Sequence, residues 1–482
     1  MDIMTNLKIT TQPYDHQMEA LTTAWGKPGF AFYLEQGTGK SKIIVDEIVN
    51  LIERELINCA VIIAPNNVHV NWKYELEKHG PKDWNQWAIQ IWRSGQNKDK
   101  REKETKSILE SNRALVFLIN IEALSAAGGK DYLRRVLLAR RKVYMAIDES
   151  HKIKTPGAQR TKACIELGRL AYIRRIATGT EAEEGLENLY SQFRFLDQNI
   201  IGLRSFTAFR SMYCLMGGYE NRAIIGYQNQ ELLAQKIAPF TYHKRKKDCL
   251  DLPDKVYATH YIDMTPQQEK VYNKLEEELI YELSSGSIID ATMALTRMMR
   301  LQQVLCGHIN TTDDPRETEV IPSNRAEFVA EIVDEASSKC IVFCRFIKDV
   351  DLVVTELAQK GIRAVGVSSR VDGPGRMFEI DRWRQEKNNK VLVITISTGG
   401  TGLTLNEANT TIFYSNSWSG TDRIQAEARN HRIGQNDKVT IHDIMVRRKI
   451  DHRLYNVLMN KQNMSNQFRS IVDMQRFLTD EI

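Results

Sequence analysis

The chain has 482 residues, which is too long for one hydrophobic core of ordinary size and predicts two or three domains. Hydrophobic residues make up 42% of it and charged residues 26%, as is typical of a folded soluble protein. The formal net charge of +5 is small for this length. Any binding of nucleic acid must therefore come from local basic patches rather than from the charge of the whole chain.

The cysteines and the amino terminus indicate the cellular compartment in which the protein is expected. Seven cysteines are scattered along the chain without a C-x-x-C pair or a partner histidine at zinc spacing. This pattern indicates reduced thiols in a cytosolic compartment and no structural zinc. The first residues lack the pattern of a signal peptide, and no run reaches about 18 apolar residues. Neither secretion nor membrane spanning is predicted.

In chain order, short apolar runs are each followed by a helical pattern, which is typical of strands buried on both faces of a parallel sheet. In the first half these runs are 30–34, 59–65, 114–120, 142–149 and 174–180. From about residue 185 to 310 helical periodicity dominates, and 251–264 is the one predicted strand. The alternation returns at 339–346, 362–368, 390–397, 410–416 and 439–446. The chain is thus predicted to form two α/β lobes separated by helices.

The stretch "EQGTGKS" (35–41) lies between a predicted strand and an amphipathic helix. Gly37 and Gly39 would allow backbone N–H groups to turn inward beside a helix amino terminus, where a phosphate binds. Lys40 would meet the β and γ phosphates, and the Ser41 hydroxyl would ligate Mg²⁺. Leu34 occupies the first glycine position of the full G-x-x-x-x-G-K-[ST] pattern, so an ordinary turn stays open for this motif alone.

A pair of carboxylates ends the apolar run "KVYMAIDE" (142–149). Asp148 could hold the Mg²⁺ shell, and Glu149 could polarise an attacking water. Acidic residues also end strands as turn or cap residues, and for the pair alone both interpretations stay open. The phosphate loop upstream, with two predicted strands between, favours a Walker-type ATP site.

In their order, the motifs of this chain resemble those of the Swi/Snf-type family of helicase superfamily 2 ATPases, which translocate on double-stranded DNA. In the first half, "YDHQMEA" resembles the Gln motif, "EQGTGKS" motif I, "VIIAPNNVHVNWKYEL" the motif Ia region, "LINIEAL" motif Ib, "DESHKIK" motif II and "ATGT" motif III. In the second half, "KCIVFCRF" resembles motif IV, "VITISTGGTGLTLNEANTTIFYSNSW" motif V and the strand after it, and "DRIQAEARNHRIGQ" motif VI. The resemblance covers nearly the whole chain.

The resemblance implies an α/β fold of two RecA-like parallel-sheet lobes joined by a helical inter-lobe region. We expect lobe 1 at 1–245, with a helical extension from about 185, the inter-lobe region at 246–324 and lobe 2 at 325–482. The short inter-lobe region leaves little room for large accessory elements and indicates a minimal motor of the sort that phages and bacteria encode. The expected location is the cytoplasm of a bacterial or phage-infected cell, with a nuclear location not excluded.

The resemblance also implies the site residues. The catalytic set is Lys40, Asp148, Glu149, Arg429 and Arg432, with Mg²⁺ held by Ser41 and Asp148. ATP would be bound by Gln17, Gly37, Thr38, Gly39, Lys40, Ser41 and Gly402, and hydrolysis coupled to movement by His151, Thr178, Gly179, Thr180 and Gln425. Arg429 and Arg432 have the spacing of one helix face and would be arginine fingers. His431 between them would point elsewhere.

Three departures from the family pattern stand out. Ser150 replaces the usual alanine of motif II, and Glu181 replaces the usual proline after motif III. The stretch "SNSW" (415–418) lacks the usual acidic pair before the tryptophan. The change at Glu181 is the one expected to alter the coupling of hydrolysis to DNA movement.

A motor that walks on a duplex should touch mainly phosphates, which recur at every step. The candidate DNA contacts by resemblance are Asn71, Trp72, Lys152, Lys154, Ser397, Thr398 and Trp418. For Trp72 a core position stays open, since a helix tryptophan is more often buried than in contact with a ligand. The expected partners are double-stranded DNA and proteins on DNA, with no membrane and no zinc.

The sequence thus predicts DNA-stimulated ATP hydrolysis that drives translocation on double-stranded DNA and remodels DNA or protein–DNA complexes. A strand-separating or branch-migrating helicase is an alternative, although no wedge or pin domain is evident. A nucleotide-gated DNA-binding module with slow turnover is an alternative of another class. A small-molecule kinase would leave the second lobe and its arginine pair unexplained.

Overall fold

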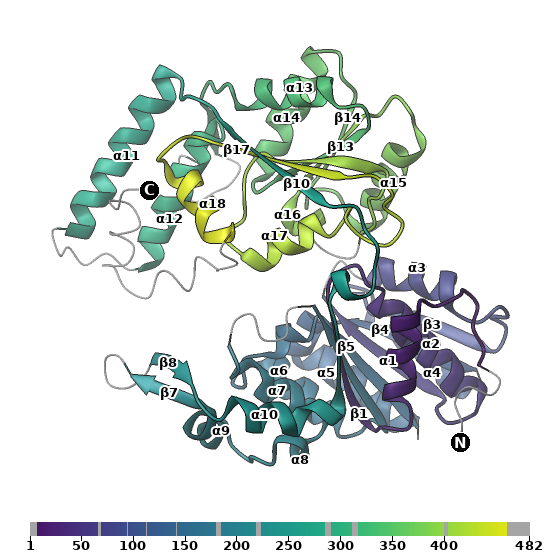
Figure 1. Cartoon of the computed structure of the whole chain (residues 1–482). Helices are drawn as coiled ribbons and strands as arrows, with labels where there is room; N and C mark the ends of the chain where they lie inside the picture. Colours follow the sequence, from purple (N-terminus) through teal and green to yellow (C-terminus); the bar gives the residue numbers. More distant parts are fainter. Residues whose placement is uncertain are drawn as a thin grey trace. The chain divides into compact units, whose positions relative to one another are not determined.

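The computed structural model describes residues 7–65, 69–93, 95–111, 113–140, 142–179, 185–217, 223–284, 291–310, 317–399 and 403–459. The chain divides into two compact units, Met1–Asp251 and Leu252–Ile482. Each unit is built around one parallel sheet, labelled in Figure 1, and both lobes are RecA-like α/β layers.

Seven parallel strands form the sheet of the first unit, in the order β3-β4-β2-β5-β6-β1-β9. Their bounds, from one edge of the sheet to the other, are Trp87–Ile91, Ala114–Asn120, Cys59–Ala64, Val143–Asp148, Ile173–Thr178, Gly29–Leu34 and Thr241–Lys244. Because all pairs are parallel, every strand ends at the same edge. The loops that follow β1, β5 and β6 therefore meet there.

Helices cover both faces of this sheet. They are α1 (Asp15–Ala24), α2 (Lys40–Glu53), α3 (His69–His79), α4 (Lys98–Glu110), α5 (Ala127–Ala139), α6 (Gln159–Gly168), α7 (Asn188–Leu196), α8 (Gln198–Ile201), α9 (Phe206–Tyr213) and α10 (Gln230–Ile237). Alternate side chains of β1 show the division: Phe30 and Phe32 pack with α1, α2 and α3, whereas Ala31 and Tyr33 pack with α5, α6 and α7. Because β1 is buried on both faces, its sequence is a continuous run of apolar residues.

The second unit has six parallel strands in the order β10-β17-β16-β13-β15-β14. Their bounds, in the same order, are Lys255–Tyr261, Val439–Met445, Ala408–Phe413, Lys339–Cys344, Val391–Thr395 and Ala364–Val367. The helices are α11 (Pro266–Ser284), α12 (Ala291–Leu305), α13 (Arg325–Glu335), α14 (Ile347–Gln359), α15 (Gly373–Gln385), α16 (Ile396–Gly399), α17 (Gly420–Glu427) and α18 (Ile450–Met459). A small pair, β11 (His308–Asn310) and β12 (Thr318–Val320), completes the unit.

The region predicted as inter-lobe packs with the second unit. β10 is the edge strand of its sheet, and Tyr272 of α11 and Met298 of α12 share an apolar cluster with Val446 and Ile450. The four helices predicted between about residue 185 and 310 are present as α7, α10, α11 and α12. Compactness alone defines the two units, so the three-part division at 245 and 324 stays a prediction.

The prediction that 251–264 holds the one strand between 185 and 310 is wrong. The antiparallel hairpin of β7 (Cys214–Gly217) and β8 (Ala223–Tyr227), strand β9 and strand β11 also lie there. Strand β9 has four residues and is held by its parallel pairing with β1, so tertiary hydrogen bonds form it and local alternation does not reveal it. The edge strand β3 was missed for the same reason, and three strands rather than two separate the phosphate loop from Asp148.

All seven cysteines are free, and six of them are buried. Burial in apolar surroundings raises the pKa of Cys59 and Cys164 to about 12, as expected of unreactive thiols. Within the described part of the chain, no helix combines the length and apolar character needed to cross a membrane.

Candidate ATP site

The predicted phosphate loop lies between β1, which ends at Leu34, and α2, which begins at Lys40. Gly37 and Gly39 adopt positive φ angles of 85° and 90°, a conformation that residues with a side chain rarely adopt. Gly39 caps α2 without a side-chain hydrogen bond, so the first N–H groups of the helix face the loop. Strand, loop and helix thus form the cradle that the sequence predicts.

The carbonyl of Thr38 ties this loop to α1. His16 Nε2 lies 2.8 Å from that oxygen, and Gln17 Nε2 donates to it at 3.0 Å. The Oε1 atom of Gln17 accepts the backbone N–H of Tyr14 at 3.1 Å. Gln17, predicted to read adenine, therefore contacts the phosphate loop directly. A movement of its side chain would change the hydrogen bonding of the loop.

Lys40 lies folded against its own loop. Its Nζ donates to the carbonyl of Leu34 at 2.8 Å and to that of Glu35 at 3.5 Å. The ammonium is also close enough to Asp148 and Glu149 to lower the pKa of both carboxyls. Lys40 is thus held beside the carboxylate pair. Ser41 occupies the first turn of α2 and is partly exposed.

Asp148 is the last residue of β5, and both of its oxygens have partners. Oδ2 accepts the indole N–H of Trp72 at 2.9 Å, and Oδ1 accepts the backbone N–H of Glu149 at 3.0 Å. Trp72 is only 1% exposed. Trp72 therefore lies in the core of the described structure, where it orients Asp148, and its DNA contact stays a prediction.

Glu149 has a left-handed backbone, with φ at 53° and ψ at 53°. Such a conformation costs free energy for a residue with a side chain and is often found where function requires it. It places the carboxylate between Gln36 and His151: Gln36 Nε2 donates to Oε1 at 3.0 Å, and His151 Nδ1 lies 3.3 Å from Oε2. His151 Nδ1 also lies 3.2 Å from Thr178 Oγ1, which links the end of β6 to the carboxylate.

The two carboxyls respond oppositely to their surroundings. Burial, and then the charge of Glu149, raise the pKa of Asp148 above the ordinary value. Burial also raises the pKa of Glu149, but the hydrogen bond and charge of His151, together with Lys40 and Gln36, outweigh it and hold the pKa well below its usual range. Glu149 is therefore the group held ionised, as a general base must be.

Gly179 brings the predicted coupling motif against the phosphate loop. A Cβ at this position would lie 3.1 Å from the backbone N of Gln36 and 3.2 Å from the carbonyl of Leu34. Thr178 is fully buried at the end of β6. Motifs I, II and III are thus in contact through Gln36, His151, Thr178 and Gly179.

The residues present fit a magnesium ion. Two adjacent buried carboxylates attract a cation, and the Asp148 carboxylate and Ser41 hydroxyl are the hard oxygen donors that Mg²⁺ prefers. Among the described residues there is no cluster of three or more His, Cys, Asp or Glu side chains.

In the second unit, Arg429 and Arg432 converge on one oxygen. Arg429 NH1 donates to the carbonyl of Leu403 at 3.3 Å, and Arg432 NH1 donates to the same atom at 3.1 Å. The prediction that both lie on one helix face is wrong, because α17 ends at Glu427. The Leu405 N–H donates to the Arg429 carbonyl at 2.9 Å. This tertiary hydrogen bond stands in place of the one that the carbonyl would accept in a longer helix.

Arg429 also donates a hydrogen bond at the end of α17. Arg429 Nε donates to the carbonyl of Gln425 at 2.8 Å, which places the predicted coupling residue Gln425 next to Arg429. His431 Nε2 lies 2.8 Å from the carbonyl of Pro253.

A buried ion network holds α17 in place. Arg423 donates to both oxygens of Asp443 on β17, to Glu427 at 2.7 Å and to Asn416 at 2.8 Å. Its guanidinium also lies 3.6 Å from the ring centroid of Phe413. Sequence reasoning missed Arg423, although it lies inside motif VI, as it missed Gln36 inside motif I. Their position within these motifs could have identified both residues from the sequence.

The remaining DNA-contact candidates differ in exposure. Ser397 is exposed, and Asn71, Lys152, Lys154 and Trp418 are partly exposed. Thr398 is 3% exposed, and its Oγ1 accepts a hydrogen bond from Thr395 Oγ1 at 2.8 Å. Thr398 is therefore a core residue in the described structure, and its DNA contact stays a prediction. Thr180 and Gly402, predicted as coupling and ATP-binding residues, lie outside the described residues, as does Glu181.

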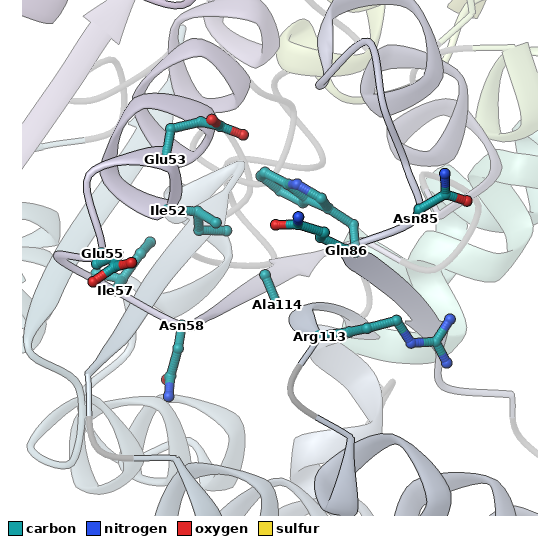
Figure 2. A pocket seen from close by; sticks show the side chains of 10 residues that line it. Ile52, Glu53, Glu55, Ile57, Asn58, Asn85, Gln86, Arg113 and Ala114 are labelled. Atoms are coloured by element: carbon teal, nitrogen blue, oxygen red, sulfur yellow. The ribbon is translucent and has the colours of Figure 1, made fainter.

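A separate hollow of about 500 Å³ lies at the opposite edge of the first sheet. Figure 2 shows Asn58, Gln86 and Arg113, each of which immediately precedes a strand, together with Ile52 and Glu53 at the end of α2. The phosphate loop begins α2, so this hollow is at the far end of that helix and is not the candidate ATP site.

Comparisons with known proteins identify the family of this chain. The SNF2-related domain matches residues 14–310, and the helicase conserved C-terminal domain matches residues 324–434. An uncharacterized ATP-dependent helicase of Mycoplasma pneumoniae is 26% identical over 439 residues, which are 89% of this chain and 39% of the relative. Human DNA excision repair protein ERCC-6 is 24% identical over 363 residues, which are 69% of this chain and 24% of the relative. The chain therefore spans less than half the length of these relatives.

Among solved structures, the Sulfolobus solfataricus SWI2/SNF2 ATPase core in complex with dsDNA is 20% identical, with a TM-score of 0.44 over all of this chain and 97% of that one. The SNF2-related match covers more than half of the chain and includes the phosphate loop, Asp148 and Glu149. The chain belongs to the SNF2-related family of ATPases.

Proposed function

We propose that this chain hydrolyses ATP in response to double-stranded DNA and uses that reaction to translocate along the duplex. The observation that carries the proposal is the contact between the phosphate loop and the predicted base. Gln36, within the loop, donates a hydrogen bond of 3.0 Å to the carboxylate of Glu149. A nucleotide phosphate in the loop would therefore lie next to an ionised carboxylate that can activate water.

The chemistry assigned to the first unit is hydrolysis of the β–γ anhydride. A water oxygen bonds to the γ-phosphorus, the bond from that phosphorus to the β–γ bridging oxygen breaks, and the water proton passes to Glu149. Lys40 turns from the Leu34 carbonyl toward the phosphates. Mg²⁺ held by Ser41 and Asp148 would supply positive charge to the phosphate oxygens when bound.

Arg429 and Arg432 of the second unit supply further positive charge to the transferring phosphoryl group in the hydrolysing state. Two guanidinium groups donate to the same carbonyl, that of Leu403, so an anion brought to this point would be attracted to both. If hydrolysis needs charged residues from both units, the turnover rate would depend on how often the two units close.

Duplex DNA is the proposed track. The partly exposed Asn71, Lys152 and Lys154 in the first unit and the exposed Ser397 in the second are the remaining polar candidates for phosphate contacts. Burial, followed by repulsion from Lys152 and Arg160, lowers the pKa of Lys154, and a phosphate bound beside it would favour its charged form. The name of the human relative, a DNA excision repair protein, also supports a DNA substrate. Proteins bound to that DNA and a cytoplasmic location belong to the same proposal.

The test is steady-state phosphate release from ATP and Mg²⁺ with no nucleic acid, single-stranded DNA, duplex DNA or duplex RNA, at low and moderate salt. Stimulation by duplex DNA above the other three supports the proposal, and displacement of a triplex-forming strand then tests movement. Equal or greater stimulation by single strands or RNA contradicts it in favour of a strand-separating helicase. No stimulation by any of them favours a nucleotide-gated binding module.

A further inference from the structure

The segment that carries Arg429 and Arg432 is not part of a helix. Helix α17 ends at Glu427, and residues 428–435 form turns and bends. Outside a helix, regular backbone hydrogen bonds do not fix the direction of each side chain. The positions of the two guanidinium groups therefore depend on the contacts that this segment makes with the rest of the second unit.

One side of the segment is bonded to strand β16 (Ala408–Phe413). Asn430 Nδ2 donates to Thr411 Oγ1 at 2.9 Å, and Gln435 Nε2 donates to the carbonyl of Ala408 at 3.1 Å. Both amide side chains are buried. They hold the segment against the sheet but leave its other side to be fixed by different residues.

His431 fixes that other side. Its Nε2 lies 2.8 Å from the carbonyl oxygen of Pro253, which is two residues before β10 begins at Lys255. A carbonyl oxygen only accepts hydrogen bonds, so Nε2 carries the hydrogen and donates it. His431 thus bonds the segment to the chain that leads into β10.

Glu427, the last residue of α17, makes a second connection to the same strand. Its carboxylate accepts hydrogen bonds of 2.8 Å from Lys255 Nζ and from the Tyr257 hydroxyl. Burial raises the pKa of Glu427, but the charges of Lys255 and Arg423 outweigh it and lower the pKa to about 2. The end of α17 is therefore held to β10 by a carboxylate that stays ionised at neutral pH.

His431 is well placed to control both arginines. It lies between them in the chain, and both guanidinium groups donate to the carbonyl of Leu403. If the bond to Pro253 were lost, the backbone that carries the two arginines could shift. A displacement of about 1 Å in a group that acts on the transition state can cost about 10²-fold in rate.

We infer that His431 is a positioning residue for ATP hydrolysis, which holds Arg429 and Arg432 in place through its hydrogen bond to the carbonyl of Pro253. The inference rests on the proposed function, since it takes the two arginines to supply charge to the phosphoryl group. His431 itself contacts neither ATP nor the attacking water in this role. Pro253 is the second residue of the second unit, so the arginine segment is anchored where the chain enters that unit.

The test compares variants of the full chain by steady-state phosphate release over a range of ATP concentrations, with Mg²⁺ and saturating duplex DNA. His431→Ala is expected to lower kcat by roughly 10- to 100-fold. The KM for ATP should stay within about twofold, because the residues assigned to ATP binding do not include His431. Thermal melting shows whether each variant is folded.

Two conservative variants identify the atom responsible. His431→Gln places an amide N–H donor at the reach of Nε2 and should restore most of kcat. His431→Asn places its amide nitrogen at the reach of Nδ1, too short for Pro253, and should not restore it. His452→Ala is the matched control, because the His452 ring contacts Tyr261 at the other end of β10. It should keep the wild-type kcat and KM.

A double variant separates positioning from a general structural role. If His431 acts through the arginines, the loss of kcat in His431→Ala combined with Arg432→Ala should be well below the product of the two single losses. Two residues that act independently would give the full product. That result would overturn the positioning role of His431.

The remaining outcomes separate the inference from the proposed function. If Arg432→Ala slows hydrolysis but His431→Ala does not, or if His431→Asn restores kcat as well as His431→Gln, the inference is overturned and the motor stands. If Arg432→Ala hydrolyses ATP at the wild-type rate, the arginine role falls and the inference falls with it. If duplex DNA does not stimulate the wild type, the proposed track falls, and the same variants test His431 on the basal rate.

Discussion

Arg429 and Arg432 donate to the same atom, the carbonyl oxygen of Leu403, at 3.3 and 3.1 Å. Arg429 lies 26 residues and Arg432 29 residues after Leu403 in the chain, so the fold brings the two guanidinium groups to one acceptor. We propose that a phosphate oxygen, which carries negative charge, takes the place of this neutral carbonyl in the hydrolysing state.

Arg432→Ala tests this exchange. The variant should bind nucleotide with near wild-type affinity and lose DNA-stimulated hydrolysis by roughly 10³-fold or more, the range expected of an arginine finger. Nucleotide binding is followed with a fluorescent ATP analogue and turnover by phosphate release. Arg382→Ala, which removes an exposed arginine paired with Glu379, is the control. Wild-type turnover in Arg432→Ala would make Arg432 a structural residue.

Glu149→Gln tests the general base. The amide keeps the size of the side chain and the bond from Gln36 but cannot take a proton from water, so hydrolysis should fall by about 10² to 10⁴. ATP binding should survive, and with ATP present the variant should remain bound to duplex for longer than the wild type. Dissociation of labelled duplex after dilution measures this. Fast turnover would remove Glu149 from the base role.

Gln36→Leu should change the pH dependence of hydrolysis. The Gln36 amide favours the ionised form of Glu149, and its loss raises the pKa of that carboxyl by about one unit if the bond contributes about 1.5 kcal/mol. Because the base acts only when ionised, the acid limb of kcat/KM against pH should move upward, while activity at high pH changes little. An unchanged acid limb would show that Gln36 does not set the ionisation of Glu149.

The sequence predicted structural features formed by neighbouring residues, but it did not predict contacts between segments that are far apart in the chain. The strand ending at Leu34, the glycine loop and the helix from Lys40 are contiguous, so their pattern sufficed. The bond from Gln36 to Glu149 joins residues 113 apart, and no periodicity encodes it. The helix expected through Arg432 ends at Glu427, because the Leu405 N–H donates to the Arg429 carbonyl, which would accept a helical hydrogen bond in a longer helix. The fold class follows from apolar runs, whereas the four-residue strand β9 depends on pairing with β1.

Trp72→Phe separates a role in the core from a role on DNA. The phenyl ring fills most of the same space but cannot donate to Asp148 Oδ2, so the pKa of that carboxyl should rise further and a proton should compete more effectively with Mg²⁺. Loss of such an orienting bond typically weakens metal affinity by about 10- to 100-fold. The Mg²⁺ concentration for half-maximal hydrolysis measures the effect.

The control for that variant is Trp87→Phe, which makes the same deletion at another buried tryptophan of the first unit. Both variants should lose similar thermal stability, since each leaves a small cavity, but only Trp72→Phe should need more Mg²⁺. The salt dependence of duplex binding should be unchanged in both, because Trp72 lies in the core. A reduced salt slope in Trp72→Phe alone would restore Trp72 as a DNA contact, reached through a conformation in which α3 (His69–His79) opens.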